Sequence, residues 1–360
     1  MEYLKNVHEK SKTINEDDLV FFNIFDRPDI FYGNPLISYG NQIGFRKYNI
    51  LTEREIEAYS DDAKREYANL SLNVSGCFLR FKNSSGRLII KFELKRKWDL
   101  LRMPLWNSSG FDVYEVQNGE YIHRTVFAPQ SGENIGCEEI KHNPKNEVVI
   151  YLPLYNEIIN LYIGSKGKIE AVDTVKRPAV AFYGNSITQG ASASRSGNCF
   201  VNIFSRLTNT EVYNYSVSSC CRGLKSVAQT LGTLNLKAIV IDYSRNAENV
   251  LALKQSHEQF YKEVRKYHEH IPIVIMTVSN FREITNVFNY NSPIFSTYQN
   301  ALKNNENTIF FDQMGLFGLD EYDLCSFDGT HYTDYGMYRI AENLAEILEL
   351  KESTDEKQKS

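Results

Sequence analysis

The sequence predicts an α/β protein of two domains, in which a three-layer domain with a five-stranded parallel sheet follows an antiparallel β-sandwich. The 360 residues exceed what one hydrophobic core usually supports. The first half alternates apolar and polar residues in short segments, and the second half alternates apolar runs with segments that suit helices. We place the sandwich at residues 1–170, the α/β domain at 176–350 and a disordered, charged tail at 351–360.

Six segments of the first half have the period-two alternation of half-buried strands, and turn residues separate them at the spacing of a sandwich. These predicted strands are 76–82, 87–95, 111–116, 121–127, 147–155 and 158–164. The segment 51–70 interrupts the pattern. It has helical propensity, and both a helix and a loop remain open for it.

Five apolar runs of the second half predict strands that are buried on both faces, as in a parallel sheet. These runs are 178–183, 211–217, 237–243, 272–278 and 308–312. The clearest helices between and after them are 198–207, 257–271 and 334–348. Right-handed crossovers then cover both faces of the sheet, and an active site is expected at the carboxyl ends of the strands.

Composition narrows the possible partners. With 42% hydrophobic and 24% charged residues, the chain can bury a sizeable core. Its net charge of -5 gives no basic surface for nucleic acid or for an anionic membrane, so neither partner is predicted. The first residues lack a signal-peptide core, and no run reaches the ~18 apolar residues of a membrane span, which predicts a cytoplasmic protein.

The cysteines predict neither a metal site nor a disulfide framework. Six are scattered along the chain without a C-x-x-C pair, so reduced thiols are expected and no metal or cofactor is predicted. The adjacent Cys220 and Cys221 allow a redox interpretation. Burial as small residues is favoured, because a disulfide between neighbouring cysteines is strained.

Small and polar residues follow the predicted strands at one edge of the sheet. They are Gly184, Asn185 and Ser186; Ser218 and Ser219; Ser244, Arg245 and Asn246; and Asp328 and His331 before the last helix. A serine hydroxyl becomes a good nucleophile when an adjacent base accepts its proton. His331 can be that base for Ser186, and Asp328, three residues earlier, can orient its imidazole.

An oxyanion that develops during acyl transfer requires preorganised donors. The candidates are the amide N–H groups of Ser186 and Ser219 and the side-chain amide of Asn246. Each of these motifs alone has a simpler explanation, because Asn-Ser caps helices, Asp-Gly-Thr-His forms turns and Asn246 can close an Asx-turn. Their convergence on one sheet edge favours catalysis.

Four motifs resemble, in order, the blocks of the SGNH (GDSL-type) hydrolase superfamily over roughly residues 176–350. They are GNSIT at 184–188, NYSVSSCCRG at 214–223, SRNAEN at 244–249 and DGTHYTDYG at 328–336. The resemblance implies a flavodoxin-like three-layer fold, with Ser186 as nucleophile and with Asn246, Asp328 and His331 in the roles given above. One departure is Ser219, which stands where the family usually has a glycine, and a positive φ there would strain a non-glycine residue.

The first domain adds a second resemblance. SSGFDVYEV at 108–116 is similar to the Gly-x-Asp-Leu-Tyr element of a jelly-roll-like β-domain that precedes a bacterial branch of these esterases. Packing is favoured for Asp112 and Tyr114, with substrate contact as the alternative. Trp98 and Trp106 flank the element and can form either a sugar-stacking platform or core. The substrate-binding candidates are Asn185, Arg245, Asp112, Tyr114 and Trp106.

These observations predict a serine esterase that acts through an acyl-enzyme without a cofactor. The resemblance implies an O-acetylated oligosaccharide or polysaccharide as substrate, and a small-molecule ester is the simplest alternative. Within enzymes, a lipase, lysophospholipase or acyltransferase of the same fold remains open. Outside enzymes, the alternative is a carbohydrate-binding protein that has lost catalysis.

Overall fold

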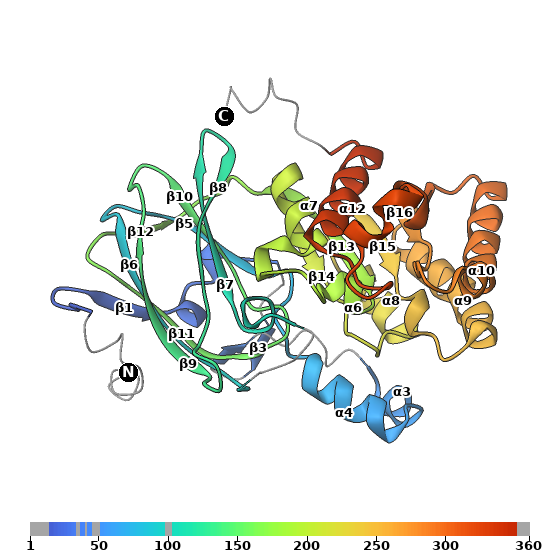
Figure 1. The fold of residues 1–360 in the computed structure, drawn as a ribbon, viewed down its shortest axis with the longest axis horizontal. Helices are drawn as coiled ribbons and strands as arrows, with labels where there is room; N and C mark the ends of the chain where they lie inside the picture. The colour runs from blue at the N-terminus through green and yellow to red at the C-terminus, as the bar shows by residue number, and fades with distance from the viewer. Residues whose placement is uncertain (1–13, 34–36, 40–41, 45–50, 98–102, 351–360) are drawn as a thin grey trace.

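The computed structural model describes residues 14–33, 37–39, 42–44, 51–97 and 103–350. An all-β part and an α/β part lie beside each other along the long axis of the molecule (Figure 1). The predicted tail, 351–360, and Trp98 lie outside the described residues.

The β-domain consists of two antiparallel sheets. One has the strand order β1 (Val20–Asn23), β11 (Ile158–Ser165), β6 (Arg87–Leu94) and β9 (Ile135–Lys141). The other has the order β12 (Ile169–Ala171), β5 (Phe78–Asn83), β10 (Glu147–Tyr151), β7 (Phe111–Gln117) and β8 (Glu120–Phe127), and β2 (Phe31–Tyr32) also pairs with β5. A separate hairpin joins β3 (Ile37–Tyr39) and β4 (Gln42–Gly44).

The core of this domain lies between the two sheets. Leu88 and Ile90 of β6 are fully buried in the same cluster as Val148 and Ile150 of β10. All six predicted strands are present, and the antiparallel β-domain is confirmed. The strands β1, β2, β3, β4 and β12 were not predicted, because they have only two to four residues. Strand β9 was not predicted either, because two adjacent glutamates break its alternation.

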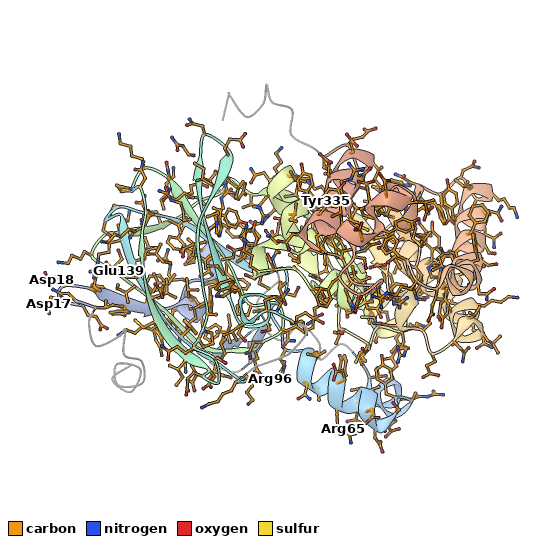
Figure 2. The ribbon with its side chains drawn as sticks, in the orientation of Figure 1. Asp17, Asp18, Arg65, Arg96, Glu139 and Tyr335 are labelled. Atoms are coloured by element: carbon orange, nitrogen blue, oxygen red, sulfur yellow. The ribbon has the colours of Figure 1, made fainter. Side chains whose placement is uncertain are left out.

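The segment 51–70 forms two short helices, α3 (Glu53–Glu57) and α4 (Asp61–Leu70). Thr52 and Ser60 cap them by accepting hydrogen bonds from backbone N–H groups of the first turn. Tyr59, between the helices, donates a hydrogen bond to the carbonyl of Cys220 at 2.5 Å, so this segment packs on the α/β domain. Arg65 on α4 points to solvent at the lower edge of the view (Figure 2).

The α/β domain is built on a five-stranded parallel sheet, as predicted. Its strand order is β14 (Thr210–Asn214), β13 (Lys176–Gly184), β15 (Leu236–Asp242), β16 (Ile273–Met276) and β17 (Thr308–Phe311). The chain moves from β13 to one edge of the sheet and then crosses back to build the other edge. The carboxyl ends of β13 and β15 are therefore adjacent where the order reverses, which is where ligands bind in such sheets.

Helices cover both faces of the sheet (Figure 1). They are α6 (Ser186–Gln189), α7 (Phe200–Thr208), α8 (Lys225–Gly232), α9 (Val250–Tyr267), α10 (Ile284–Lys303), α11 (Tyr322–Cys325) and α12 (Asp334–Ile347). Helix α7 packs on α12, and α8 and α10 pack on α9. Right-handed crossovers place these two groups on opposite faces.

Two helices differ from their predictions. Helix α9 begins seven residues before the predicted 257, because Asn249 caps it by accepting a hydrogen bond from the Ala252 N–H at 2.9 Å. Helix α10 was not singled out, because Pro293 lies inside it and proline usually ends a helical pattern. Within the described ranges, no helix combines the length and the apolar character required to cross a bilayer.

All six cysteines are free and buried. Burial raises the pKa of Cys220 and of Cys221 to about 12, so both remain thiols at neutral pH. The structure therefore agrees with packing as their role, because the thiolate is the reactive form.

Candidate active site

Ser186 lies at the turn between β13 and α6. The strand ends at Gly184, Asn185 caps the helix, and Ser186 is its first residue. The Asn185 side chain accepts a hydrogen bond from the Ile187 N–H at 2.7 Å and donates one to the Asp242 carbonyl at 2.6 Å. This side chain is 2% exposed and holds the turn, which argues against the substrate contact predicted for Asn185.

Gly184 leaves the space into which this turn folds. A Cβ atom at position 184 would lie 2.1 Å from Thr188 Oγ1 and 3.1 Å from Asp242 Cβ. We expect Gly184→Ala to lower the free energy of unfolding by about 1–3 kcal/mol, because the turn must move away from β15. Urea unfolding measures the loss, and Gly318→Ala is the control, because Gly318 has an ordinary φ of -69° and an added Cβ atom would meet the end of the exposed Asp320 side chain. Equal stability of Gly184→Ala and the wild type would contradict this packing.

The three predicted catalytic side chains lie within hydrogen-bonding distance of one another. Ser186 Oγ is 2.9 Å from His331 Nε2, and His331 Nδ1 is 2.8 Å from Asp328 Oδ2. With the proton on Nδ1, the imidazole donates to Asp328 and its Nε2 accepts from the serine hydroxyl. This arrangement can remove a proton from Ser186 when the oxygen attacks a carbonyl.

A tight turn holds Asp328 and His331 in place. Asp328 Oδ1 accepts hydrogen bonds from the Thr330 and His331 N–H groups at 3.0 and 2.8 Å. Partial burial alone would raise the pKa of Asp328, but these N–H groups and the His331 side chain lower that pKa to about 2. The carboxylate is therefore charged at neutral pH and can stabilise a protonated His331.

The predicted oxyanion donors lie on three elements. Ser186 N is the first amide of α6, where the N–H has no intrahelical acceptor. Strand β14 ends at Asn214, three residues before its predicted end, so Ser219 lies in a turn beyond the strand. Gln189 ties this turn to α6 by accepting from the Ser218 N–H at 2.7 Å. The Asn246 side chain donates to the Val217 carbonyl at 3.4 Å, which places this amide beside the same turn.

The backbone of Ser219 has the conformation that glycine prefers. Its φ angle is +62°, and the side chain is exposed. We expect Ser219→Gly to raise the free energy of unfolding by up to about 1 kcal/mol, since relief of left-handed strain outweighs the added chain entropy. Its kcat should stay within threefold of the wild type, because the donor is the backbone N–H. A tenfold loss of kcat would instead assign a role to the Ser219 hydroxyl.

Arg245 lines a small cavity next to the histidine turn. Its guanidinium donates to Thr330 Oγ1 at 3.0 Å and to the Ser279 carbonyl at 3.2 Å. The cavity has a volume of about 250 Å³ and is lined by Arg245, Val278, Asn280, Glu283, Val287 and Tyr290. Burial lowers the pKa of Arg245. The predicted substrate contact for Arg245 remains a prediction, and the structure adds a role in holding the turn.

Asp112 and Tyr114 join the two domains. Asp112 Oδ2 accepts from the Gly197 N–H at 2.9 Å and from Arg195, and Oδ1 is 2.9 Å from His123 Nε2. Tyr114 Oη accepts from Arg195 at 2.8 Å. Both side chains are buried, which agrees with the favoured packing interpretation and argues against the alternative of substrate contact. They fix the loop that follows the nucleophile turn to the β-domain.

Trp106 is 54% exposed on the short helix α5 (Leu105–Ser108). The next residue, Asn107, donates hydrogen bonds to the carbonyls of Gly190 and Ala193, both at 2.8 Å. Trp106 thus stands where the β-domain meets the segment directly after α6. Its exposure excludes the core interpretation and leaves the stacking interpretation as a prediction.

Three residues that support this segment were not predicted from the sequence. Asn107 of the β-domain binds the Gly190 carbonyl, and Arg195 of the α/β domain binds Asp112. The Tyr155 hydroxyl donates to the Ser186 carbonyl at 3.1 Å. Asn107 and Arg195 do not lie at a predicted strand end, and Tyr155, which ends the predicted strand 147–155, was assigned no role. A signal for Asn107 was its position just before the SSGFDVYEV element.

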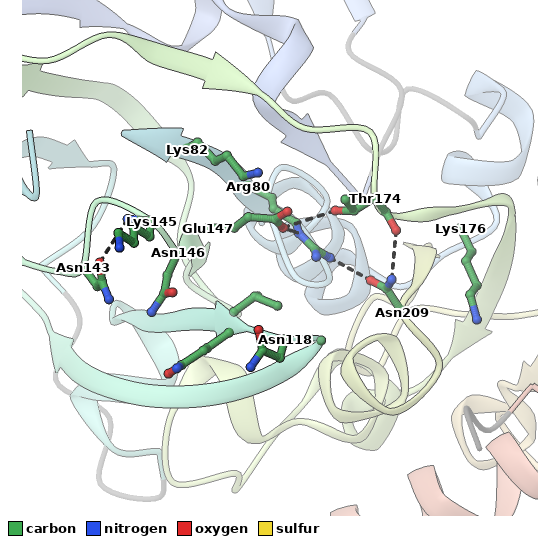
Figure 3. A pocket seen from close by; sticks show the side chains of 13 residues that line it. Arg80, Lys82, Asn118, Asn143, Lys145, Asn146, Glu147, Thr174, Lys176 and Asn209 are labelled. Atoms are coloured by element: carbon green, nitrogen blue, oxygen red, sulfur yellow. Dashed lines mark hydrogen bonds and ion pairs between the residues drawn. The ribbon is translucent and has the colours of Figure 1, made fainter. Parts of the chain in front are cut away.

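A larger cavity of about 800 Å³ lies away from Ser186, between the β-domain and the amino-terminal edge of the parallel sheet (Figure 3). Arg80 lies in it and donates to Glu147 and Asn209, both at 2.7 Å. Lys176 begins β13 and Asn209 precedes β14, whereas Ser186 follows the opposite end of β13.

In the part of the chain that the structure describes, no group of three His, Cys, Asp or Glu side chains could hold a metal ion.

Comparisons with known families match both domains. Residues 177–349 match the GDSL-like Lipase/Acylhydrolase family, and residues 48–170 match GxDLY, described as the N-terminus of Esterase SGNH hydro-type. This chain belongs to the GDSL-like lipase/acylhydrolase family, with an N-terminal GxDLY domain. The resemblance identified from the four motifs and the SSGFDVYEV element is therefore confirmed.

Solved structures share the two-domain fold of this GDSL-like protein. A protein described as a GDSL-like lipase from Bacteroides ovatus ATCC 8483 has a TM-score of 0.77 at 22% identity, covering 92% of this chain and 99% of that one. A salicylyl-acyltransferase from a tetracycline biosynthetic pathway has 0.72 at 16%, covering 92% and 97%. An acetyl xylan esterase from Butyrivibrio proteoclasticus has 0.57 at 14%, covering 92% and 97%. The comparison with curated proteins gives no match.

Proposed function

We propose that this protein is a carboxylic ester hydrolase that removes O-acetyl groups from oligosaccharides or polysaccharides through a serine acyl-enzyme. The observation that carries the proposal is the chain of hydrogen bonds from Ser186 Oγ to His331 Nε2 at 2.9 Å and from His331 Nδ1 to Asp328 at 2.8 Å. Nucleophile, base and orienting carboxylate occupy the positions that acyl transfer requires.

The geometry supports the following steps. His331 takes the hydroxyl proton while Ser186 Oγ attacks the ester carbonyl, and Asp328 stabilises the imidazolium. The N–H groups of Ser186 and Ser219 and the amide of Asn246 stabilise the oxyanion. His331 then gives the proton to the leaving alcohol. In the second half, His331 activates a water molecule that releases the acid from the acyl-enzyme.

Two features support a small acyl group on a polar substrate. The cavity lined by Arg245 has a volume of about 250 Å³, and Asn280 and Glu283 add polar groups to its wall. The exposed Trp106 offers a flat apolar ring of the kind on which sugars stack. The likeness to an acetyl xylan esterase is a likeness of fold and is consistent with this substrate class.

The decisive experiment compares acyl groups and carriers. We expect acetate release from acetylated xylo- or manno-oligosaccharides, and a kcat/KM for p-nitrophenyl acetate at least tenfold above that for the octanoate. Preference for octanoate would contradict the proposal. It would point to the cavity of about 550 Å³ that Tyr59, Arg222 and Ala247 help to line, beside the oxyanion residue Asn246.

The same assay separates hydrolysis from acyl transfer. Acetate is the expected product even when acceptor alcohols are added. If the transferred ester exceeds acetate, the protein is an acyltransferase, as the structural neighbour with a TM-score of 0.72 is described to be.

A further inference from the structure

A buried carboxylate lies directly beneath the nucleophile turn and takes no part in the proposed steps. Asp242 ends β15 and is 2% exposed. Its Oδ2 accepts from Thr188 Oγ1 at 2.6 Å, and its Oδ1 accepts from Gln313 Nε2 at 2.8 Å. Its backbone carbonyl accepts from Asn185 Nδ2 at 2.6 Å. One residue therefore receives hydrogen bonds from both sides of the active site.

The first set of these contacts holds the turn that carries Ser186. Asn185 precedes the nucleophile and Thr188 follows it by two residues, and both bind Asp242. Gly184 has no side chain to separate Thr188 from β15. The turn is thus attached to β15 on both sides of Ser186.

The second set leads to the residue beside His331. The buried Gln313 also donates to the Thr277 carbonyl at 2.5 Å, and its Oε1 accepts from the Tyr332 hydroxyl at 3.2 Å. Tyr332 follows His331 and is completely buried. Asp242 and Gln313 therefore connect the nucleophile turn to the segment that carries the base.

Burying a charged carboxylate at this position costs free energy. A carboxylate is nevertheless a better acceptor than an amide for the two donors that face it. Burial raises the pKa of Asp242 to about 7. The positive charge of Arg245 opposes this rise in pKa, and the phenol of Tyr332 is a second titratable group that interacts with Asp242. The residues that hydrogen-bond Asp242 are neutral: Asn185, Thr188 and Gln313. A carboxylate accepts at both oxygens, whereas an amide accepts at one. The ionised form accepts from the Thr188 O–H and the Gln313 N–H at once, whereas a protonated carboxyl or an asparagine amide would accept on one side and donate on the other.

We propose that Asp242 is a positioning residue whose carboxylate ties the Ser186 turn to the His331 segment and thereby keeps Ser186 Oγ within reach of His331 Nε2. This inference rests on the proposed ester hydrolysis. It assigns no contact with substrate to Asp242. Loss of the tie lowers the fraction of molecules in which Ser186 and His331 are aligned, so it lowers kcat more than it changes KM.

The test uses Asp242→Asn, Thr188→Val and the combined variant of the full chain, assayed with p-nitrophenyl acetate. We expect each single variant to lose at least tenfold in kcat, with KM within twofold. The kcat of the combined variant should be close to that of the less active single variant, because both changes break the same connection. Thr297→Val is the matched control: it removes a buried threonine hydroxyl that bonds His257 at 2.9 Å, away from the turn, and should leave kcat within twofold.

Stability against pH separates positioning from simple packing. Asp has a pKa of about 3.9 in unfolded chains, and that of Asp242 is about 7 in the fold. Between these values the folded state binds more protons, so this residue's contribution to stability falls as pH rises from about 4 to about 7. Asp242→Asn lacks this dependence. Its Tm relative to wild type should therefore be higher at pH 8 than at pH 5, while the kcat ratio of wild type to variant is largest at pH 8.

Two results would overturn the assignment: kcat within twofold of wild type in both single variants, or losses no greater than in Thr297→Val. If Asp242→Asn does not fold, Thr188→Val carries the test. Ser186→Ala keeps the two proposals apart. An active Ser186→Ala overturns the ester hydrolysis itself, whereas an inactive Ser186→Ala beside a fully active Asp242→Asn overturns the positioning role alone.

Discussion

Replacing Ser186 with alanine is expected to lower kcat by about 10³-fold or more, because it removes the atom that forms the acyl-enzyme while His331 and Asp328 remain. The side chain adds one hydrogen bond to the fold, the 2.9 Å contact with His331, so the Tm should change little. Steady-state ester hydrolysis measures the loss, and thermal unfolding checks the fold.

Ser194→Ala is the matched control for this variant. Ser194 is an exposed serine of the neighbouring loop, and its hydroxyl bonds Asp334 at the start of α12. Its kcat should stay within threefold of wild type. A Ser186→Ala variant that keeps a tenth of the wild-type rate would remove Ser186 from the mechanism and favour a carbohydrate-binding protein.

Asp112→Ala is expected to lower the free energy of unfolding by about 3 kcal/mol, because removing one partner of a buried ion pair leaves the other uncompensated. Asp112 is completely buried, and its loss leaves Arg195 and the Gly197 N–H without this acceptor. Urea unfolding measures the change. Since the loop that follows the nucleophile turn loses its anchor on the β-domain, kcat should fall as well.

Glu139→Ala provides the comparison for Asp112→Ala. Glu139 pairs with Arg87 at 2.7 Å within the β-domain, and both side chains are about 30% exposed. Exposed pairs contribute roughly 0–1 kcal/mol, so this variant should be nearly as stable as wild type. Equal losses in the two variants would show that Asp112 does not join the domains in solution.

The sequence could predict the elements whose side chains repeat with a clear period. Apolar runs such as 237–243 identify buried strands because both faces of a parallel sheet are covered. It could not predict β9, where Glu138 and Glu139 interrupt the period, or α10, which contains Pro293. In both elements, pairing and packing with distant parts of the chain outweigh a weak local preference.

The candidate site divides in the same way. Ser186, Asp328 and His331 were predictable, because their motifs stand at the expected sheet edge and chemistry restricts the residue types. Packing was favoured for Asp112, and helix capping was an alternative for Asn185. The partners of both side chains were not predictable, since the sequence of a motif does not show whether its polar residue contacts substrate or a buried partner. The hydrogen bonds that Asp112 accepts from Arg195 and Gly197 cross 83 to 85 residues of chain, and local sequence carries no information on such contacts.

By itself, the sequence determined the family, the parallel sheet and the three residue types that acyl transfer needs, because periodicity and short motifs are local properties. The tertiary structure alone decided that residues 186 and 331 meet at 2.9 Å, and that Asp242 lies between the segments carrying them. The physical reason is that burial and long-range hydrogen bonds arise from strand order and domain packing, which place distant stretches of the chain side by side.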